Sequence, residues 1–323
     1  MKHRLKDLLF SEPRVLHFQL EDRCNMACPM CNARSHRASR FDRLSLEEIK
    51  TLLLAPFRFA GGRRLVLSGG EPTLSEDLYE TLEYAVRLGV SVSFFTNLYR
   101  VKSEQMRKIL EIMSGGRHRV FTSYDSAYPD EMETIRGIDA HENLTSNLLS
   151  LVEMKEELKV ATEIGVGLVL QERNCRSLAD TLEFLLNLDV YRVIVTPIHL
   201  YGEIDSMNFS RVEPPCSRER LPDMLRAIET VFRLAAKSER IILPYPDIQR
   251  WRRHFVAPSQ QQGVCHSDRY VFVNCHGDYR GCLQSRAYAN VREIRMVDFL
   301  ASEVYGEHRQ LLSKCNICTS GCS

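Results

Sequence analysis

The sequence predicts an α/β fold, a partial (β/α)6 barrel of the TIM type that is followed by a small C-terminal module. Between residues 14 and 200, short β-rich runs alternate with segments of helical period, and polar or glycine-containing loops separate them. Strands joined by helices run parallel with right-handed crossovers, which gives a partial or full β/α barrel or an open doubly wound sheet. Six cysteines in the last sixty residues indicate the separate module.

Six strands are predicted, each rich in β-branched or aromatic residues. They lie at residues 15–20, 64–69, 90–97, 119–125, 163–170 and 191–198. Amphipathic helices are predicted between them, including 45–57, which Ser45 can cap, 75–89, which ends on Gly89, and 177–188. In either architecture the reactive groups gather at the carboxyl ends of the strands.

The chain is expected to divide into three parts. Residues 1–205 form the barrel, 206–262 form a helical connector, and 263–323 form the C-terminal module. A polar linker, APSQQQG, marks the second boundary. The module is too small for much of a core and is rich in cysteine, so we expect a metal to hold it together.

Composition and charge set a default for the function. The 323 residues are 44% hydrophobic and carry a formal net charge of +1, so we expect a globular protein with no general attraction to nucleic acid or to an anionic membrane. No segment approaches transmembrane length, and the apolar run near the amino terminus is too short for a signal peptide. We therefore expect a cytoplasmic enzyme, in which eleven cysteines indicate metal or catalytic roles.

Cys24, Cys28 and Cys31 form a C-x3-C-x2-C pattern just after the first predicted strand. Three thiolates on a tight loop can converge on one metal centre, and a cuboidal iron-sulfur cluster accepts such ligation while one iron keeps an open position. An open position favours chemistry, because a substrate or cofactor can bind the metal directly. The alternative is structural zinc, with His36 as the fourth ligand.

The segment CNMACPMC, residues 24–31, resembles the signature of the radical S-adenosylmethionine (radical SAM) enzymes, and three more segments support the resemblance. LSGGEP at 67–72 matches the second family motif, and FFTN at 94–97 resembles the T-N-G strand end, with Leu98 in place of glycine. Residues 122–137 resemble the S-L-D and I-R-G segment. The resemblance covers roughly residues 14–205, and it implies that the cofactor contacts are Met30, Gly69, Gly70, Glu71, Pro72, Asn97, Ser123, Asp125, Arg136 and Asn174.

The resemblance implies chemistry that side chains alone cannot perform. S-adenosylmethionine binds the open iron of a [4Fe-4S] cluster, an electron breaks its carbon-sulfur bond, and the resulting 5′-deoxyadenosyl radical abstracts a hydrogen atom from an unactivated C–H bond. The backbone and Glu71 are expected to hold the methionine amino group, and Met30 takes the place of an aromatic residue near the adenine. The barrel mouth must exclude water and hold the target carbon in position.

The C-terminal cysteines resemble the auxiliary-cluster module of the SPASM and Twitch subgroups of radical SAM proteins. The pattern Cys265-x11-Gly277-x4-Cys282 predicts a hairpin with its turn at 274–277. The resemblance implies one auxiliary [4Fe-4S] cluster, a free thiol at Cys275, and the cluster ligands Cys265, Cys282, Cys315 and Cys318, with Cys322 as the leading substitute. Structural zinc is the alternative for this module.

Four further residues are candidates for catalytic roles. Cys216 or Cys175 could give a hydrogen atom to a substrate radical, with Cys216 preferred because it lies in an irregular segment; the alternative is a small packing side chain. His199 and Glu203, after the sixth strand, could supply a general base, although a barrel-end histidine is as often a packing residue. A basic run at 34–43 indicates a solvated loop or a clamp for a substrate carboxylate or phosphate.

These observations predict an enzyme that abstracts a substrate hydrogen and passes the electron of the substrate radical to the auxiliary cluster. The substrate is expected to be a small polar biosynthetic intermediate, because the chain leaves no room for a leader-peptide domain before the first strand; a peptide brought by a partner protein is the other candidate. A flavodoxin or ferredoxin would donate electrons. The alternatives are a redox-neutral epimerase or decarboxylase with a cysteine hydrogen donor, and a non-catalytic metal-binding scaffold.

Overall fold

A single ten-stranded sheet organises the molecule. The computed structural model describes residues 15–31, 41–199, 215–258, 270–282 and 285–307. Within them the strand order is β10-β9-β8-β1-β2-β3-β4-β5-β6-β7. The strands are β1 (Val15–Glu21), β2 (Arg64–Gly69), β3 (Ser91–Phe95), β4 (Arg119–Ser123), β5 (Glu163–Leu170), β6 (Arg192–Pro197), β7 (Ile241–Ile242), β8 (Tyr270–Val273), β9 (Asp278–Arg280) and β10 (Ala287–Asn290).

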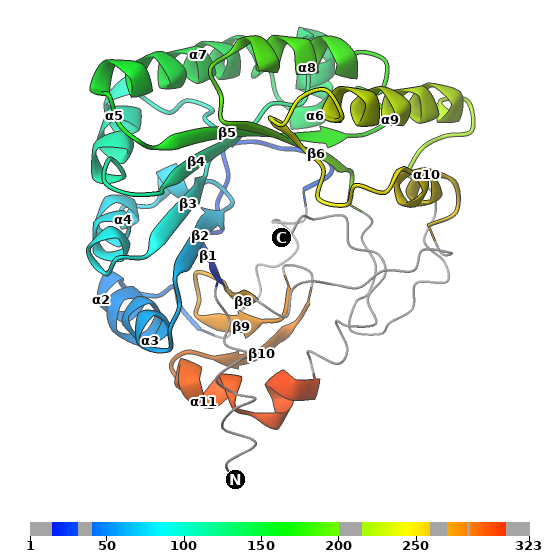
Figure 1. The fold of residues 1–323 in the computed structure, drawn as a ribbon. Coiled ribbons are helices and arrows are strands. Elements are labelled where there is room, and N and C mark those ends of the chain that lie inside the picture. Colours follow the sequence, from blue (N-terminus) through cyan, green and yellow to red (C-terminus); the bar gives the residue numbers. More distant parts are fainter. Residues whose placement is uncertain (1–14, 32–40, 200–214, 259–269, 283–284, 308–323) are drawn as a thin grey trace.

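The strand order decides between the two predicted architectures. From β1 to β7 every neighbouring pair is parallel, and each strand lies beside the next one in the sequence. A doubly wound sheet would reverse its order at a central strand. Figure 1 shows that the sheet curves round and that the helices lie on its outer side. The fold is a partial β/α barrel, as predicted, so the carboxyl ends of its parallel strands face one end of the barrel.

All six predicted strands are present, but three are shorter than predicted, and the strand expected at 191–198 lacks one residue at each end. The strand expected at 90–97 ends at Phe95, and the strand expected at 119–125 ends at Ser123. The residues that follow carry polar groups that bond to neighbouring loops instead of extending the strand, as Asn97 does with its backbone N–H. The alternation of apolar and polar residues does not predict where the backbone hydrogen bonds change from the strand to a loop.

The helices connect consecutive strands, as right-handed crossovers require. The predicted helix at 45–57 runs through three contiguous segments, the middle one π-helical, and Ser45 caps it, since its Oγ accepts a hydrogen bond from the backbone N–H of Glu48 (3.3 Å). The helices are α2 (Leu46–Glu48), η2 (Ile49–Leu54), α3 (Ala55–Phe59), η3 (Pro72–Leu74), α4 (Leu78–Arg87), α5 (Ser103–Ile112), α6 (Pro129–Arg136), α7 (His141–Leu158), α8 (Leu178–Asn187), α9 (Leu221–Ala235), α10 (Ile248–Val256) and α11 (Met296–Leu300).

The main core lies between the curved sheet and the helices. The longer helices each bury one apolar face, and α9 does so with the residues Met224, Ala227, Ile228 and Val231, which recur at helical spacing. Trp251 of α10 is buried as well, and its indole N–H donates to the carbonyl of Tyr245 (2.9 Å). This packing fixes the positions of the strand ends, on which the functional loops are built.

The described part of the C-terminal segment continues the barrel sheet. β8 pairs parallel with β1, with Phe18 opposite Val273, and β9 and β10 follow antiparallel. The predicted hairpin is confirmed between β8 and β9, where Gly277 has a φ of +86°. The sheet is therefore continuous across the boundary expected at residue 262.

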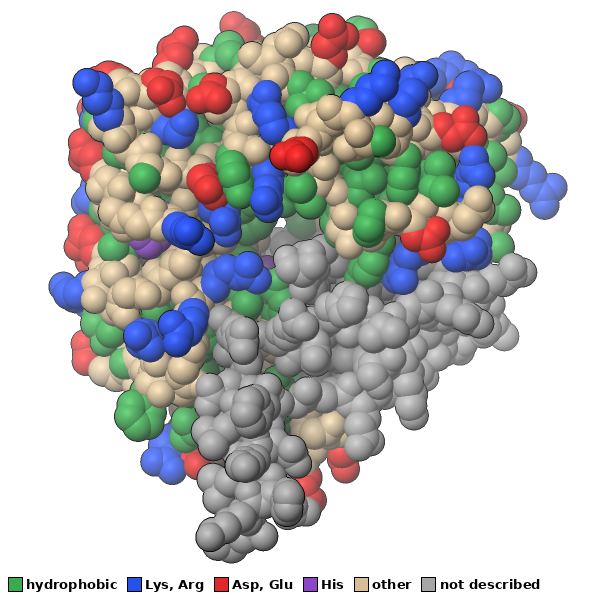
Figure 2. Space-filling model, viewed as in Figure 1, with side chains coloured by type: hydrophobic (Ala, Val, Ile, Leu, Met, Phe, Trp, Pro, Cys, Tyr) green, Lys and Arg blue, Asp and Glu red, His purple; other side chains and the backbone are tan. Residues whose placement is uncertain are grey.

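The surface of the described part carries mixed charge. Figure 2 shows several Lys and Arg side chains around the hollow in this face, with acidic side chains near them. None of the helices in the described ranges combines the length and the apolar character that a membrane crossing would need.

Candidate active site

The cysteine loop begins directly after β1. The backbone N–H of Cys31 donates to the carbonyl of Cys28 (3.1 Å), which makes the tight turn that the spacing predicts. Cys24 and Cys28 are half-buried and Cys31 is exposed. Burial raises the pKa of the Cys24 and Cys28 thiols, and nearby negative groups, among them the neighbouring thiols, raise it further. Such a group of thiols favours a cation, because a bound metal keeps its cysteine ligands deprotonated.

Two glycines allow the loop after β2 to lie against the cysteine loop. The backbone N–H groups of Gly70 and Glu71 donate to the carbonyls of Glu21 (2.6 Å) and Arg23 (2.8 Å). A Cβ atom at Gly69 or Gly70 would overlap the backbone of Glu21 or Arg23. Only glycine permits this approach, which explains the two glycines of the GGEP segment.

The Glu71 carboxylate joins the ends of β2 and β3. It is fully buried and accepts hydrogen bonds from the backbone N–H (3.0 Å) and hydroxyl (2.7 Å) of Thr73, the hydroxyl of Thr96 (2.8 Å) and the backbone N–H of Asn97 (2.6 Å). Burial raises its pKa, and these four hydrogen bonds oppose the rise. The carboxylate thus has an internal positioning role, and its contact with a methionine amino group remains a prediction.

Asn97 links Glu71 to the cysteine loop. Its side-chain amide lies 3.6 Å from the Sγ atom of Cys24 and 2.8 Å from the side-chain oxygen of Asn25, and its own oxygen accepts from the backbone N–H of Tyr99 (2.8 Å). Leu98, which replaces the expected glycine, has a φ of +59°, in the left-handed region that favours glycine. The backbone at Leu98 therefore has a conformation that glycine would adopt without strain.

Arg136 reaches the cysteine loop from the end of α6. Its guanidinium is buried and pairs with Asp125 (2.7 Å), and its positive charge opposes the rise that burial causes in the pKa of the Cys28 thiol. Its carbonyl also accepts from the backbone N–H of Ala27 (3.1 Å). Gly137 has a φ of +70°, and a Cβ atom there would meet the carbonyl of Ala27 at 2.5 Å. The I-R-G segment thus holds the loop through both a side chain and a close backbone contact.

Asp125 forms an ion pair with Arg136, and Asn174 is hydrogen-bonded to Asp125. Asp125 is buried and accepts from the backbone N–H of Val169 (2.8 Å). The amide of Asn174 donates to the carbonyls of Asp125 (2.8 Å) and Val169 (2.9 Å). Both side chains have internal partners, so in this structure they position the loops after β4 and β5. Of the other predicted contacts, Pro72 is buried, and Met30 and Ser123 are partly exposed.

One ion-pair cluster beside the cysteine loop was missed in the sequence analysis. Glu21, the last residue of β1, is buried and pairs with Arg23 (2.9 Å) and with Arg43. Burial would raise the pKa of Glu21, but hydrogen bonds from both guanidinium groups lower it to about 2. Arg43, a member of the predicted substrate clamp, is therefore already paired with an internal carboxylate. The signal was the E-D-R triplet that precedes Cys24.

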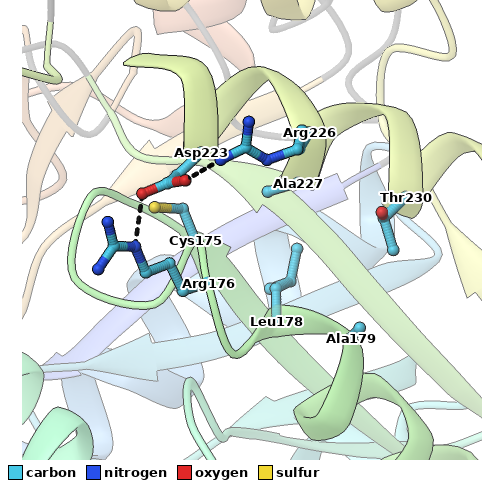
Figure 3. Close-up of a pocket in the computed structure, with 8 residues that line it drawn as sticks. All are labelled: Cys175, Arg176, Leu178, Ala179, Asp223, Arg226, Ala227 and Thr230. Atoms are coloured by element: carbon cyan, nitrogen blue, oxygen red, sulfur yellow. Dashed lines mark hydrogen bonds and ion pairs between the residues drawn. The ribbon is translucent and has the colours of Figure 1, made fainter. Parts of the chain in front are cut away.

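The two lone cysteines lie near the start of α8 and α9. The Cys175 thiol donates to the carbonyl of Glu172 (3.2 Å), and Cys216 donates to the carbonyl of Ser217 (3.5 Å). Burial raises the pKa of both thiols, that of Cys216 to about 11. Cys175 lines a cavity of about 340 Å³ between α8 and α9, next to Asp223 (Figure 3).

The histidine after β6 is neutral at physiological pH. Burial lowers the pKa of His199 to about 4. The neighbouring carbonyl of Ile198 accepts from Nε2 of His254 (2.7 Å), which fixes the backbone beside His199. Cys282 follows β9 and packs against the small apolar cluster of Val15, Tyr270 and Phe272. The remaining predicted site residues lie outside the described part of the chain, namely residues 34, 36, 37 and 40 of the basic run and Glu203, Cys265, Cys315, Cys318 and Cys322.

The fold and the three-cysteine loop define a β/α barrel enzyme built around a metal cluster. Residues 20–185, about half of the chain, match the profile of the Radical SAM superfamily. The chain belongs to this superfamily. Its cofactors are a [4Fe-4S] cluster and S-adenosylmethionine, and the donor set fits them, since one loop presents three cysteines near the amide of Asn97 and the guanidinium of Arg136. This finding replaces the zinc alternative for the loop.

Similar proteins act on different substrates. The chain is 29% identical over 153 residues to a probable GTP 3′,8-cyclase of Thermococcus kodakarensis, covering 47% of this chain and 48% of that protein. It is 25% identical over 193 residues to a PqqA peptide cyclase of Rhodopseudomonas palustris, covering 60% and 49%. The match thus spans about half the length of these curated relatives.

Solved structures share the fold. SuiB of Streptococcus suis bound to S-adenosylmethionine has a TM-score of 0.70 and 16% identity, with 99% of this chain and 76% of that chain covered. SuiB has also been solved bound to the precursor peptide SuiA. At this identity the likeness shows a common fold.

Proposed function

We propose that this enzyme oxidises a C–H position of its substrate and passes the electron of the substrate radical to an auxiliary [4Fe-4S] cluster. When bound, the catalytic cluster and S-adenosylmethionine supply the 5′-deoxyadenosyl radical that removes the hydrogen. The observation that carries the proposal is the chain of contacts from Cys24 through Asn97 to Glu71, which joins the cluster loop to the GGEP loop.

The residues of the site have separate tasks in this proposal. Cys24, Cys28 and Cys31 would hold the catalytic cluster, and the absence of a fourth cysteine in this loop would leave a position for the cofactor. The amide of Asn97, beside Cys24, and the positive charge of Arg136, near Cys28, would tune the cluster. The backbone of the 69–72 loop, together with Ser123 and Met30, would contact S-adenosylmethionine.

The auxiliary cluster would lie at the C-terminal module. Cys282 follows β9, and β9 is connected through β8 to β1, the strand that leads into the catalytic loop. The sheet therefore supplies a rigid frame between one auxiliary ligand and the catalytic site. We assign the other ligands to Cys265, Cys315 and Cys318, with Cys322 as substitute. Four protein ligands would favour electron transfer over substrate binding, and a flavodoxin or ferredoxin would reduce the catalytic cluster.

A redox-neutral reaction is the second candidate function. Cys216 has a thiol pKa of about 11, raised first by burial, so it keeps its hydrogen at neutral pH. A hydrogen-atom donor needs that S–H form, and Cys216 lies in a segment near the carboxyl end of β5. Epimerisation would then return a hydrogen from Cys216 to the substrate radical, with Cys175 as the alternative donor.

The relatives support two substrate classes. A peptide is supported by the PqqA peptide cyclase and by the precursor peptide bound to SuiB. A small polar intermediate is supported by the GTP 3′,8-cyclase. His199, neutral at physiological pH, could accept the proton that makes the substrate radical a stronger reductant, and Glu203 is the other proposed base.

The test is cofactor cleavage followed by product analysis. The anaerobically reconstituted protein, given dithionite and S-adenosylmethionine, should form 5′-deoxyadenosine, and the Cys28→Ala variant should form none. If the wild-type protein does not cleave the cofactor, the alternative of a non-catalytic metal-binding scaffold is supported instead. With candidate peptides and nucleotides, a product lighter by two hydrogens supports oxidation. Solvent deuterium in the product, lost in Cys216→Ala, supports epimerisation instead.

A further inference from the structure

Three side chains that suit a metal ion meet where β1 and β8 end. Asp22 follows β1, and Cys275 and His276 follow β8. The two strands pair parallel, so their carboxyl ends lie side by side. One ligand atom from each of the three residues lies within 4.8 Å of the other two. The sheet therefore creates this group from residues that are far apart in the sequence.

The tautomer of His276 leaves a lone pair on Nε2, the ring nitrogen near Asp22 and Cys275. Its Nδ1 lies 2.8 Å from the carbonyl oxygen of Phe41. A carbonyl only accepts, so Nδ1 carries the proton and Nε2 of the neutral ring is an acceptor. Metal-binding histidines commonly donate their other ring N–H to a carbonyl in this way. Nε2 is buried and lacks a hydrogen-bond partner.

One oxygen of the Asp22 carboxylate lies close to Nε2 of His276. Its Oδ1 atom lies 3.4 Å from Arg43, and its Oδ2 atom lies 3.4 Å from Nε2 of His276. The second separation does not have hydrogen-bond geometry, since Nε2 lacks such a partner. Two acceptors at this distance repel each other unless a proton or a metal ion lies between them. Two ligands of one tetrahedral zinc ion are separated by a similar ~3.3 to 3.7 Å.

Cys275 completes the group as a buried thiol. Its side chain is 3% exposed, and its carbonyl accepts from the backbone N–H of Leu44 (2.7 Å), which fixes the turn. Burial raises the pKa of this thiol to about 12, so it stays protonated without a metal. Zinc binding would ionise it and release the proton to solvent.

We propose that Asp22, Cys275 and His276 bind a zinc-like divalent transition-metal ion, separate from the catalytic and auxiliary cluster ligands. The set combines one sulfur, one nitrogen and one oxygen, which suits zinc, and a solvent molecule would take the fourth position. The ion ties the β8–β9 turn to the loop that carries the catalytic cysteines, because Asp22 lies two residues before Cys24. This proposal does not depend on the proposed reaction.

The test measures zinc and iron separately in the full-length holoenzyme. Elemental analysis should find about one zinc per chain, and this zinc should persist when Cys24, Cys28 and Cys31 are all changed to Ala. Cys275→Ser, His276→Gln and Asp22→Asn should each lower zinc retention at least tenfold during dialysis against a chelator. Cys216→Ser, which removes a thiol elsewhere, is the matched control and should keep its zinc.

If the variants fail to fold, X-ray absorption at the zinc edge of the wild-type protein tests the proposed ligand set. One sulfur and three nitrogen or oxygen scatterers are expected, with Zn–S at ~2.3 Å. Four sulfurs would place the zinc in the C-terminal cysteine tail and overturn the proposal. Absence of zinc from the wild-type protein, or full retention in folded Cys275→Ser, would overturn it as well.

Discussion

The side-chain amide of Asn97 lies 3.6 Å from the Sγ atom of Cys24, while the backbone N–H of the same residue donates to Glu71. One residue thus connects a cluster ligand to the loop that is expected to bind the cofactor. An N–H donor beside a ligand sulfur stabilises the reduced, more negative cluster, so this contact bears on the reduction potential.

We predict that Asn97→Ala lowers the midpoint potential of the catalytic cluster. Loss of one hydrogen bond, about 0.5 to 1.5 kcal/mol, corresponds to about 20 to 65 mV for one electron. The measurement is a redox titration followed by electron paramagnetic resonance. Asn25→Ala is the control, because it removes the other partner of the Asn97 amide but keeps the contact with Cys24. Equal potentials in wild type and Asn97→Ala would rule out the tuning role.

The buried pair of Arg136 and Asp125 should be strongly coupled. We predict that Arg136→Met lowers the unfolding free energy of the cluster-free chain by about 3 to 5 kcal/mol, because Asp125 is left charged and buried. Adding Asp125→Asn should recover part of the loss. The measurement is anaerobic urea unfolding.

The control for that prediction is an exposed pair. Arg107 and Glu157 lie 3.0 Å apart with side chains 39% and 64% exposed, so Arg107→Met should cost about 0 to 1 kcal/mol. Similar losses in Arg136→Met and Arg107→Met would contradict a special role for burial.

The free energy of unfolding should decrease as the pH is lowered from 6.5 toward 4, because a buried histidine resists protonation in this range. His254 is 1% exposed, and burial lowers its pKa from 6.5 to about 4. Between these values the unfolded chain takes up the proton and the folded chain does not. The contribution is therefore complete above pH 6.5 and is lost as the pH falls toward 4.

The matching variant is His254→Gln, which keeps a donor for the carbonyl of Ile198. Its unfolding free energy should depend less steeply on pH than that of the wild type, by about 1 kcal/mol per pH unit between about pH 5 and 6. Chemical unfolding curves at closely spaced pH values give both slopes. Parallel slopes would mean that the folded protein protonates His254 as readily as the unfolded chain does.

Leu98 and Arg100 offer a matched test of backbone strain, since their φ angles are +59° and +58°. Arg100 is exposed, so Arg100→Gly should stabilise the protein by up to about 1 kcal/mol. Leu98 is 2% exposed, so Leu98→Gly also loses a buried side chain and should destabilise by about 1 to 3 kcal/mol. Thermal unfolding measures both, and a stabilised Leu98→Gly would show that strain outweighs packing at this position.

Gly137 and Gly89 separate steric contact from backbone strain. Both have a φ of +70°, but a Cβ atom at Gly137 meets the carbonyl of Ala27 at 2.5 Å, whereas one at Gly89 meets nothing within 4 Å. Both alanine variants should lose similar stability from strain, about 1 to 2 kcal/mol. Only Gly137→Ala should displace the cysteine loop and lower the iron content after reconstitution. Full iron content in Gly137→Ala would mean that the loop tolerates the shift.

Local patterns predicted the barrel and the cysteine loop, because both depend on residues close together in the sequence. Strand alternation and helical period placed all six predicted strands, and the spacing of Cys24, Cys28 and Cys31 indicated the cluster. The GGEP and I-R-G segments were found by their resemblance to motifs of the radical SAM enzymes. Their detailed contacts were not, since the Glu71 carboxylate is held by Thr73, Thr96 and Asn97.

By itself, then, the sequence determined the order of strands and helices and the residue types that carry the chemistry, because hydrophobic period and motif spacing are local properties. Only the tertiary structure decided which distant groups meet. The pairing of β1 with β8 brings Asp22 beside Cys275 and His276, and the end of α6 brings Arg136 to Cys28. These contacts result from strand register and helix packing, which sum many weak interactions over the whole chain.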